Sequence, residues 1–172
     1  MSKYQVAILM GSDSDVPVMQ EAANVLKEFG ISYDMRVLSA HRTPKETAEY
    51  AENFRSKGGK IFICGAGVSA ALAGVVSAHT TLPVIGVPVD SGALQGFDAL
   101  LSTVQMPPGV PVATVGINSG KNAGLLAAQF LSVYDKALAS QIVEYKKQLK
   151  GVVETSIKNL MSQKLPNKFD PK

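Results

Sequence analysis

The residues best suited to chemistry in this chain lie in one short stretch, Ser39-Ala40-His41-Arg42-Thr43-Pro44, which brings together an imidazole, a guanidinium and two hydroxyl groups. His41 is one of only two histidines in the chain, and imidazole is the side chain that exchanges a proton near neutral pH. Taken alone, so short a motif more often marks an exposed loop whose Thr43 and Pro44 begin a helix. Whether His41 carries protons therefore depends on the elements and motifs around it.

The pattern of apolar runs and helical spacings predicts a three-layer α/β domain with a doubly wound parallel sheet. Strands alternate with helices, and such connections are right-handed crossovers that cover both faces of a parallel sheet. We expect the flavodoxin-like strand order 2-1-3-4-5. The strands are predicted at residues 4–10, 31–38, 60–64, 83–88 and 112–116, with helices that begin near 16 and 44 and that span about 69–78, 97–104 and 121–131.

The 172 residues are predicted to form a single domain, 1–172, with a core at about 4–132. A long amphipathic helix at about 135–163 follows the finished sheet, and its apolar positions recur at helical intervals among lysines. This helix needs a surface to cover, either on its own domain or on a neighbouring subunit. The helix at 69–78 is apolar on nearly all sides and also needs a second partner. We therefore expect both helices to lie at a subunit interface.

Composition argues against several classes of protein. Residues 61–89 contain no Asp, Glu, Lys or Arg, but Gly65-Ala66-Gly67 and Thr80-Thr81-Leu82-Pro83 divide them into elements too short to cross a membrane. The net charge of +3 comes from C-terminal lysines, without an arginine cluster or the aromatic residues typical of nucleic-acid binding. The single cysteine excludes an internal disulfide and suits a reducing compartment. With no signal-peptide pattern at the start, we expect a cytoplasmic protein that binds neither membrane nor nucleic acid.

Three polar or glycine-rich stretches follow the first three predicted strands. They comprise residues 11–15, 39–43 and 65–67. In open parallel sheets, ligands bind outside the carboxyl ends of the strands, where the strand order reverses. With the expected order the three stretches lie side by side, so we predict a ligand pocket between them.

The first stretch combines two hydroxyl groups with a carboxylate. Ser12 and Ser14 lie beside the start of a helix, whose free backbone N–H groups suit an anion such as a phosphate. Asp15 would repel a phosphate but could accept hydrogen bonds from ribose hydroxyls. Ser14 or Asp15 could instead only cap the helix, and the two roles are compatible.

The second and third stretches add a cation and two glycines. Arg42 offers a planar fork for bidentate phosphate contact with the Ser39 hydroxyl beside it, although it could also be a simple surface charge. Gly65 and Gly67 let backbone approach a ligand closely, but glycines after a strand often only form a turn. Together the three stretches predict a pocket for a small phosphorylated riboside, with one imidazole placed to move a proton.

Other reactive side chains are weaker candidates. His79 follows an apolar helix and has no potential ligand partners nearby in sequence, so we interpret it as structural and predict no metal site. Cys64 ends a buried strand and is expected to act as a small hydrophobic residue rather than a nucleophile. Lys121 and Asn122 follow the fifth strand, but capping explains Asn122 equally well, and we do not assign either residue to the site.

Several longer motifs occur in a fixed order along the chain. They are GSDSD after the first strand, SAHRTP after the second and GAG after the third, followed by LPVIGVPV, STVQMPPGVPVATV and NAGLLAAQ. In this order they resemble the N5-carboxyaminoimidazole ribonucleotide mutases, from about Tyr4 to the C-terminal helix. Arg42 is similar to the microbial mutase type rather than to the animal-type carboxylase, which tends to have lysine there.

The resemblance implies a role for each loop. Ser12, Asp15 and Arg42 would hold the ribose phosphate portion of the substrate, with Ser14 and Ser39 nearby. The resemblance also implies a homo-octamer that uses no metal, ATP or biotin, so we expect no cofactor.

The implied reaction moves a carboxylate from an exocyclic nitrogen to a ring carbon through carbon dioxide. His41 would be the general acid and base, first protonating the departing nitrogen and then taking the ring proton. Carbon dioxide offers no charge to bind, and the backbone of Gly65, Ala66 and Gly67 would form a tight wall that retains it.

One departure from the family pattern keeps alternatives open. Many members have GAGGAAHLPGM where this chain has GAGVSAALAGV, so Ala71 replaces a histidine and Ala73 a proline. His41 is then the only obvious imidazole of the site. The departure also leaves open a carboxylase that uses aminoimidazole ribonucleotide and free carbon dioxide. A non-catalytic nucleotide-binding module is the third alternative, because a fold does not fix a function.

Overall fold

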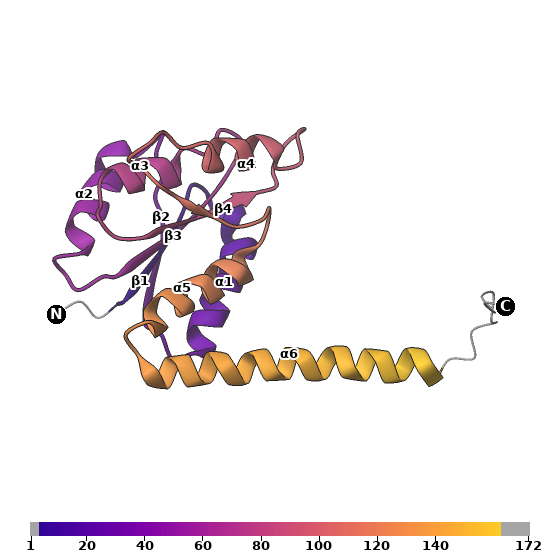
Figure 1. Ribbon diagram of the computed structural model, residues 1–172. Helices are drawn as coiled ribbons and strands as arrows, with labels where there is room; N and C mark the ends of the chain where they lie inside the picture. The colour runs from indigo at the N-terminus through magenta and orange to yellow at the C-terminus, as the bar shows by residue number, and fades with distance from the viewer. Residues whose placement is uncertain (1–3, 163–172) are drawn as a thin grey trace.

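Five parallel strands form the sheet at the centre of the molecule, in the order β2-β1-β3-β4-β5 (Figure 1). The computed structural model describes residues 4–162, so residues 1–3 and 163–172 of the predicted domain lie outside the described part. The predicted order and the parallel direction are both confirmed. The strands are β1 (Val6–Met10), β2 (Tyr33–Val37), β3 (Ile61–Gly67), β4 (Val84–Val89) and β5 (Ala113–Thr114).

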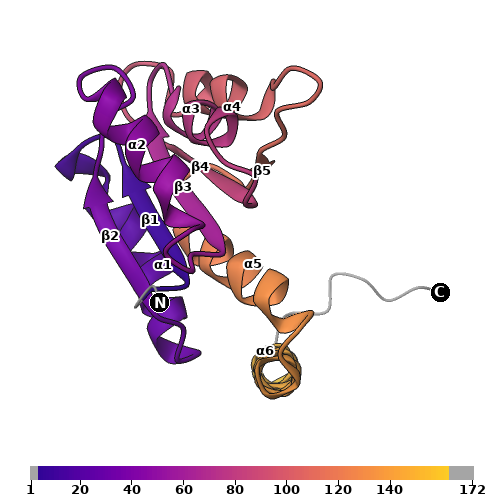
Figure 2. The ribbon, with the colours of Figure 1, turned by 90° about the vertical axis from the view of Figure 1, so that its left-hand side faces the viewer.

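Helices cover both faces of this sheet and complete the three predicted layers. Helices α1 and α5 lie on one face, whereas α2, α3 and α4 lie on the other (Figures 1 and 2). A short 3-10 turn, η1 (Asp13–Asp15), precedes the first helix. The helices are α1 (Val16–Glu28), α2 (Pro44–Phe54), α3 (Leu72–Ala78), α4 (Phe97–Val104), α5 (Gly120–Ser132) and α6 (Lys136–Ser162).

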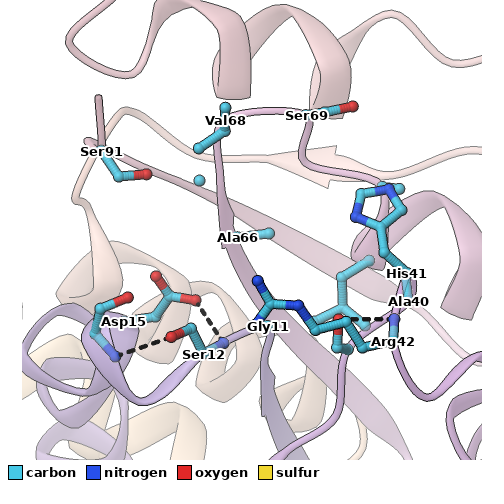
Figure 3. Close-up of a pocket in the computed structure, with 15 residues that line it drawn as sticks. Gly11, Ser12, Asp15, Ala40, His41, Arg42, Ala66, Val68, Ser69 and Ser91 are labelled. Atoms are coloured by element: carbon cyan, nitrogen blue, oxygen red, sulfur yellow. Dashed lines mark hydrogen bonds between the residues drawn. The ribbon is translucent and has the colours of Figure 1, made fainter. Parts of the chain in front are cut away.

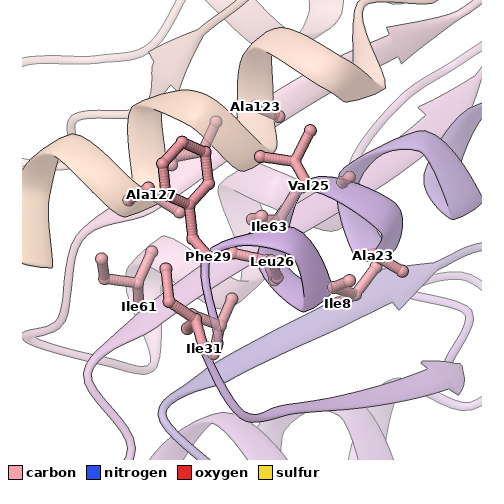
Figure 4. Packing of buried hydrophobic residues seen from close by; sticks show 14 of the residues in the cluster. Ile8, Ala23, Val25, Leu26, Phe29, Ile31, Ile61, Ile63, Ala123 and Ala127 are labelled. Carbon is pink, nitrogen blue, oxygen red and sulfur yellow. The ribbon is translucent and has the colours of Figure 1, made fainter. Parts of the chain in front are cut away.

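The core has two halves, one on each face of the sheet, because side chains alternate along a strand. From β1, Ile8 and Met10 point toward α1 and α5, while Leu9 packs on the α2 and α3 side. Figure 4 shows the first half, with Ile8 of β1 and Ala127 of α5 in the same cluster. Every residue of β1 is buried. This explains why a central parallel strand reads as one continuous apolar run.

The structure corrects the sequence prediction at two connected points. Strand β3 continues through Gly65 and Gly67, which were predicted to form a loop, and they pair in register with Val87 and Val89 of β4. A side-chain carbon at Gly65 would overlap the thioether of Met19, so this glycine lets α1 pack against the sheet. Because the strand is longer, α3 begins three residues later than predicted, at Leu72. Separately, strand β5 is shorter than predicted, because it spans residues 113–114 instead of 112–116.

Helix α6 is attached to the domain only near its beginning. Leu138 and Ile142 are buried in the first half of the core, and the ring of Tyr145 lies 5.8 Å from that of Phe29. The remainder of the helix extends away from the domain (Figure 1). Within residues 4–162, no helix combines the length and hydrophobicity that crossing a membrane would need.

Close packing of α5 against α1 yields a stability prediction. Gly120 is buried at the start of α5, and a side-chain carbon there would overlap the carbonyl oxygen of Val18 in α1. Backbone cannot move aside as a flexible side chain can, so Gly120→Ala is expected to destabilise the protein by about 1–3 kcal/mol. Lys121→Ala, at an exposed position one residue along, is the control and should change stability by less than about 0.5 kcal/mol. Urea unfolding of both variants tests this, and equal midpoints would show that the two helices are not in close contact.

Candidate active site

A cavity of about 380 Å³, open to solvent, lies at the carboxyl edge of the sheet (Figure 3). The loops after β1 and β2 and the end of β3 meet there, which confirms that the three predicted stretches lie side by side. The segment after β4 contributes a fourth part of the wall. In chain order the wall comprises Gly11, Ser12, Ser14, Asp15, residues 39–42, Ala66, Gly67, Val68, Ser69, Ala71, Leu72 and Ser91.

The loop after β1 is held by reciprocal hydrogen bonds. The Ser12 N–H donates to Asp15 Oδ2 at 3.1 Å, and the Ser14 N–H donates to Ser12 Oγ at 3.3 Å. This is a capping box around η1. The predicted cap by Ser14 or Asp15 is not formed: Asp15 stands at the N-cap position of α1 but makes no capping hydrogen bond there, and the capping residue is Ser12, which caps η1 with Asp15 as its partner. The same bonds fix the orientation of the Ser12 and Asp15 side chains at the cavity wall.

The carboxyl group of Asp15 is almost completely buried. Only 4% of the residue is exposed. Burial raises the pKa of Asp15 above its ordinary value, and the backbone N–H groups of Ser12 and Gly11 partly oppose this effect. The loop thus carries an acceptor whose ionised form is disfavoured by burial. Hydroxyl donors of a ligand would offset that cost.

The loop after β2 is a compact turn that presents His41 and Arg42. The Ser39 N–H donates to Thr43 Oγ1 at 2.9 Å, and the Arg42 N–H donates to Ser39 Oγ at 3.2 Å. Pro44 is the first residue of α2, as predicted. Both His41 and Arg42 are exposed. Within residues 4–162 neither side chain has a hydrogen-bond or ion-pair partner, so both are available to a ligand.

The end of β3 and the residues after it form another side of the cavity, where Ala66 and Val68 lie near the hydroxyl group of Ser69 (Figure 3). In Figure 3, Val68 and Ser69 lie across the cavity from Ser12 and Arg42. Gly67 does permit a close approach, as predicted for the glycines, but the group that approaches it is Ser91, whose Oγ a side-chain carbon at Gly67 would overlap.

Sequence reasoning placed all but one of its site residues on this cavity. The exception is Gly65, which is buried against Met19 and does not line the wall. It missed Ser91 altogether. A usable signal existed, because Ser91 follows the buried strand β4 at the same carboxyl edge that had located the other loops.

The remaining reactive side chains lie away from the cavity wall, as predicted. His79 contacts Glu52 on the surface, with 2.9 Å between Nδ1 and Oε1. Cys64 is buried, and burial raises the pKa of its thiol, which disfavours the nucleophilic thiolate. In the described part of the chain no three His, Cys, Asp or Glu side chains are grouped as a metal site requires.

Comparison with known proteins identifies the family. The model of the family described as AIR carboxylase matches residues 5–151. The chain belongs to the AIR carboxylase family. Among its relatives, the N5-carboxyaminoimidazole ribonucleotide mutase of Thermotoga maritima is 53% identical over 149 residues, which is 87% of each chain. That of Bacillus subtilis is 51% identical over 158 residues, covering 91% of this chain and 98% of the relative. The crystal structure of Treponema denticola PurE superposes with a TM-score of 0.81 at 35% identity, over 91% of this chain and 98% of that one.

The cavity wall includes the position at which the sequence departs from the family motif quoted above. Ala71 lines the cavity where the family motif quoted above has histidine. His79, the second histidine of the chain, is elsewhere on the surface. His41 is therefore the only imidazole that this chain places on the cavity.

Asp15 yields a prediction about stability and pH. Asp15→Asn keeps an acceptor for the Ser12 N–H but removes the ionisable group. The folded-state pKa of Asp15 is raised by burial, so its ionisation costs stability in the folded protein. As pH rises from the unfolded-state pKa through the folded-state pKa, the wild type should lose stability relative to Asp15→Asn.

Urea unfolding of both proteins across acidic and neutral pH measures this difference. Asp13→Asn is the control for removing one negative charge from the same turn. Parallel stability curves for the wild type and Asp15→Asn would contradict the prediction.

Proposed function

We propose that this protein is an N5-carboxyaminoimidazole ribonucleotide mutase of purine biosynthesis. The observation that carries the proposal is the pairing of His41 and Arg42 on one cavity, both without side-chain partners in the described residues. The identity of 53% to a relative of that name supports it. The enzyme would transfer a carboxylate within the substrate, from the exocyclic nitrogen to the ring carbon.

Substrate binding is assigned to the polar side of the cavity. Arg42 lacks a protein counter-ion among residues 4–162 and suits a phosphate, to which it can donate two parallel hydrogen bonds. Ser12 and Asp15 hold the ribose phosphate portion with it, and the buried carboxylate accepts hydrogen bonds from ribose hydroxyls. Ser14 and Ser39 supply hydroxyl groups nearby.

His41 acts as the general acid and then as the general base. The carbon–nitrogen bond of the carbamate breaks, carbon dioxide leaves, and the nitrogen takes a proton from the His41 imidazolium. The ring carbon then attacks carbon dioxide to form the carbon–carbon bond, and His41 takes the ring proton. The imidazole ends in its initial protonation state, so no net proton is consumed and no cofactor is needed.

The experiment that tests this function is an assay of purified protein with two substrates. A mutase converts N5-carboxyaminoimidazole ribonucleotide to the ring-carboxylated product faster than the carbamate decomposes unaided. The carboxylase alternative, which the altered wall at Ala71 keeps open, instead uses aminoimidazole ribonucleotide with bicarbonate or carbon dioxide. A binding module binds the nucleotide and converts neither, an outcome that would refute the proposal.

The role of His41 is tested by replacing each of the two histidines. His41→Asn should lower the rate of conversion by about 10²–10⁴-fold, because no other imidazole lines the cavity. Its affinity for substrate, measured by calorimetry, should stay near that of the wild type. His79→Asn is the matched control and should leave both quantities unchanged. An active His41→Asn enzyme would refute the assignment.

We also propose that α6 packs on neighbouring subunits of a cytoplasmic homo-oligomer, an octamer by the family resemblance. The support is an apolar stripe on a helix that leaves its own domain. Leu149, Val153, Ile157 and Leu160 recur at helical spacing and are each about half exposed, at 49%, 57%, 47% and 57%. An apolar stripe of this length is typical of a protein–protein contact.

Charge placed in this stripe should weaken assembly. Ile157→Glu removes an apolar contact worth about 1.5–3 kcal/mol and adds a charge that would have to be buried, once per subunit. We expect sedimentation to show smaller species than the wild type at the same concentration. Lys158→Glu, the adjacent exposed residue, controls for the negative charge itself. A wild-type protein that sediments as a monomer would rule out the interface.

A further inference from the structure

Three polar side chains form a network between the edge strand β2 and helix α2. The Nε–H of Arg36 donates to Asp34 Oδ2 at 2.6 Å, and the Tyr50 hydroxyl donates to the same oxygen at 2.8 Å. The Arg36 guanidinium also lies over the Tyr50 ring, 4.9 Å from its centroid. Each of the three groups therefore contacts the other two. None of the three lines the cavity described above.

The network lies where the neighbouring strands have core residues. The side chains that β1 and β3 direct toward α2 and α3 are apolar, such as Leu9 and Phe62. On β2, Met35 packs with the other half of the core, so Asp34 and Arg36 are on the side that faces α2. The Asp34 side chain is only 18% exposed there. Burying a carboxylate costs free energy unless it is hydrogen-bonded, so the two donors stabilise it.

Tyr50 is held by the core as well as by this network. Its ring stacks on that of Phe54 with centroids 5.6 Å apart, and it meets Phe62 of β3 edge-on at 6.3 Å. Burial and the hydrogen bond to Asp34 raise the pKa of the Tyr50 hydroxyl, so it remains a donor at neutral pH. Hydrophobic attraction is non-directional. The bond to Asp34 has a direction, and it therefore fixes the position of α2 on the sheet more strictly than apolar contact does.

The segment between β2 and α2 is the loop that carries His41 and Arg42 (Figure 3). Within it, the Thr43 N–H donates to the Ser39 carbonyl oxygen at 2.8 Å, so the loop is a closed turn. The Thr47 hydroxyl of α2 donates to the Thr43 carbonyl oxygen, also at 2.8 Å, which joins this turn to the helix. A shift of α2 would carry the turn with it. The position of α2 then determines where both site residues lie relative to the loop after β1.

We propose that Tyr50 is a positioning residue, which through Asp34 holds α2 and the loop after β2 so that His41 is aligned for proton transfer. This inference rests on the proposed mutase function. His41 must come within hydrogen-bond distance first of the departing nitrogen and then of the ring proton. A displacement of about 1 Å can lower a rate by about 10²-fold. The longer Arg42 side chain can adjust to a small shift, so the loss falls on kcat rather than on KM.

Tyr50→Phe tests this role, because it removes the bond to Asp34 and keeps the aromatic ring. For conversion of the carbamate we expect kcat to fall by about 5- to 50-fold, with KM within about twofold of the wild type. Asp34→Asn keeps the shape of the side chain but removes its charge, and it should also lower kcat. The double variant should be no slower than the slower single variant, because both changes act through one bond.

Thr81→Val is the matched control. It removes the hydrogen bond that the Arg55 guanidinium donates to Thr81 Oγ1 at 2.8 Å. Arg55 is the C-cap of α2, so the helix loses one side-chain bond at the end away from the loop. Urea unfolding measures the stability that each variant loses, and the control should keep the wild-type kcat. An equal loss of kcat in Thr81→Val and Tyr50→Phe, or an unchanged kcat in Tyr50→Phe, would overturn the inference.

A crystal structure of Tyr50→Phe gives a second measurement that does not depend on activity. His41 should be displaced relative to Ser12 when the variant is compared with the wild type, whereas Thr81→Val should leave it in place. An undisplaced His41 in Tyr50→Phe would overturn the inference even if kcat fell. A wild type that does not convert the carbamate would instead refute the proposed function, and the crystal structures would still decide the role of Tyr50.

Discussion

The close approach of α1 to its neighbours is the constraint on which the site depends. Gly65 admits Met19 of α1 onto β3, and Gly120 brings α5 against the backbone of Val18. Gly124 extends the same contact by one turn of α5. A side chain at Gly120 or Gly124 would meet the backbone of α1, whereas one at Gly65 would displace the side chain of Met19. The loop between β1 and α1 forms part of the cavity wall, so a displaced α1 would shift that loop relative to the loop after β2.

The elements that meet at the cavity contribute different groups to its wall. The loops after β1 and β2 carry hydrogen-bonding groups whose orientations are fixed by bonds within each loop, as between Ser12 and Asp15. The end of β3 and the residues after it contribute alkyl groups from Ala66 and Val68 together with the hydroxyl group of Ser69. The proposed reaction passes through uncharged carbon dioxide and would use both, because polar groups would bind the nucleotide and a fitted wall would hold carbon dioxide. Burial of the Asp15 carboxyl group, which raises its pKa, and the positive φ of Val68, 54°, are costs on opposite sides of the same site.

The architecture could be predicted because parallel strands buried on both faces leave an unambiguous pattern, and the topology then placed the ligand loops at one edge. The predictions that were wrong or missing concern local structure. Gly65 and Gly67 resemble a turn by propensity, but pairing with β4 keeps them in the strand. The conformation of Val68 could not be predicted, since valine is among the last residues expected at positive φ. Ser91 reaches the cavity only because Gly67 lacks a side chain, a contact between segments distant in sequence.

In the proposed oligomer, the helical order of α6 would depend on protein concentration. Its first turns are secured by Leu138 and Ile142, but beyond Tyr145 it contacts little of its own domain. A helical segment of that length without tertiary packing is marginally stable in water. In the proposed oligomer its order would come from association, so that folding of the distal half and assembly would be a single equilibrium. On dilution, the helical content of the protein would fall together with its average molar mass. An enzyme that loses its partner subunits would then also lose part of its fold.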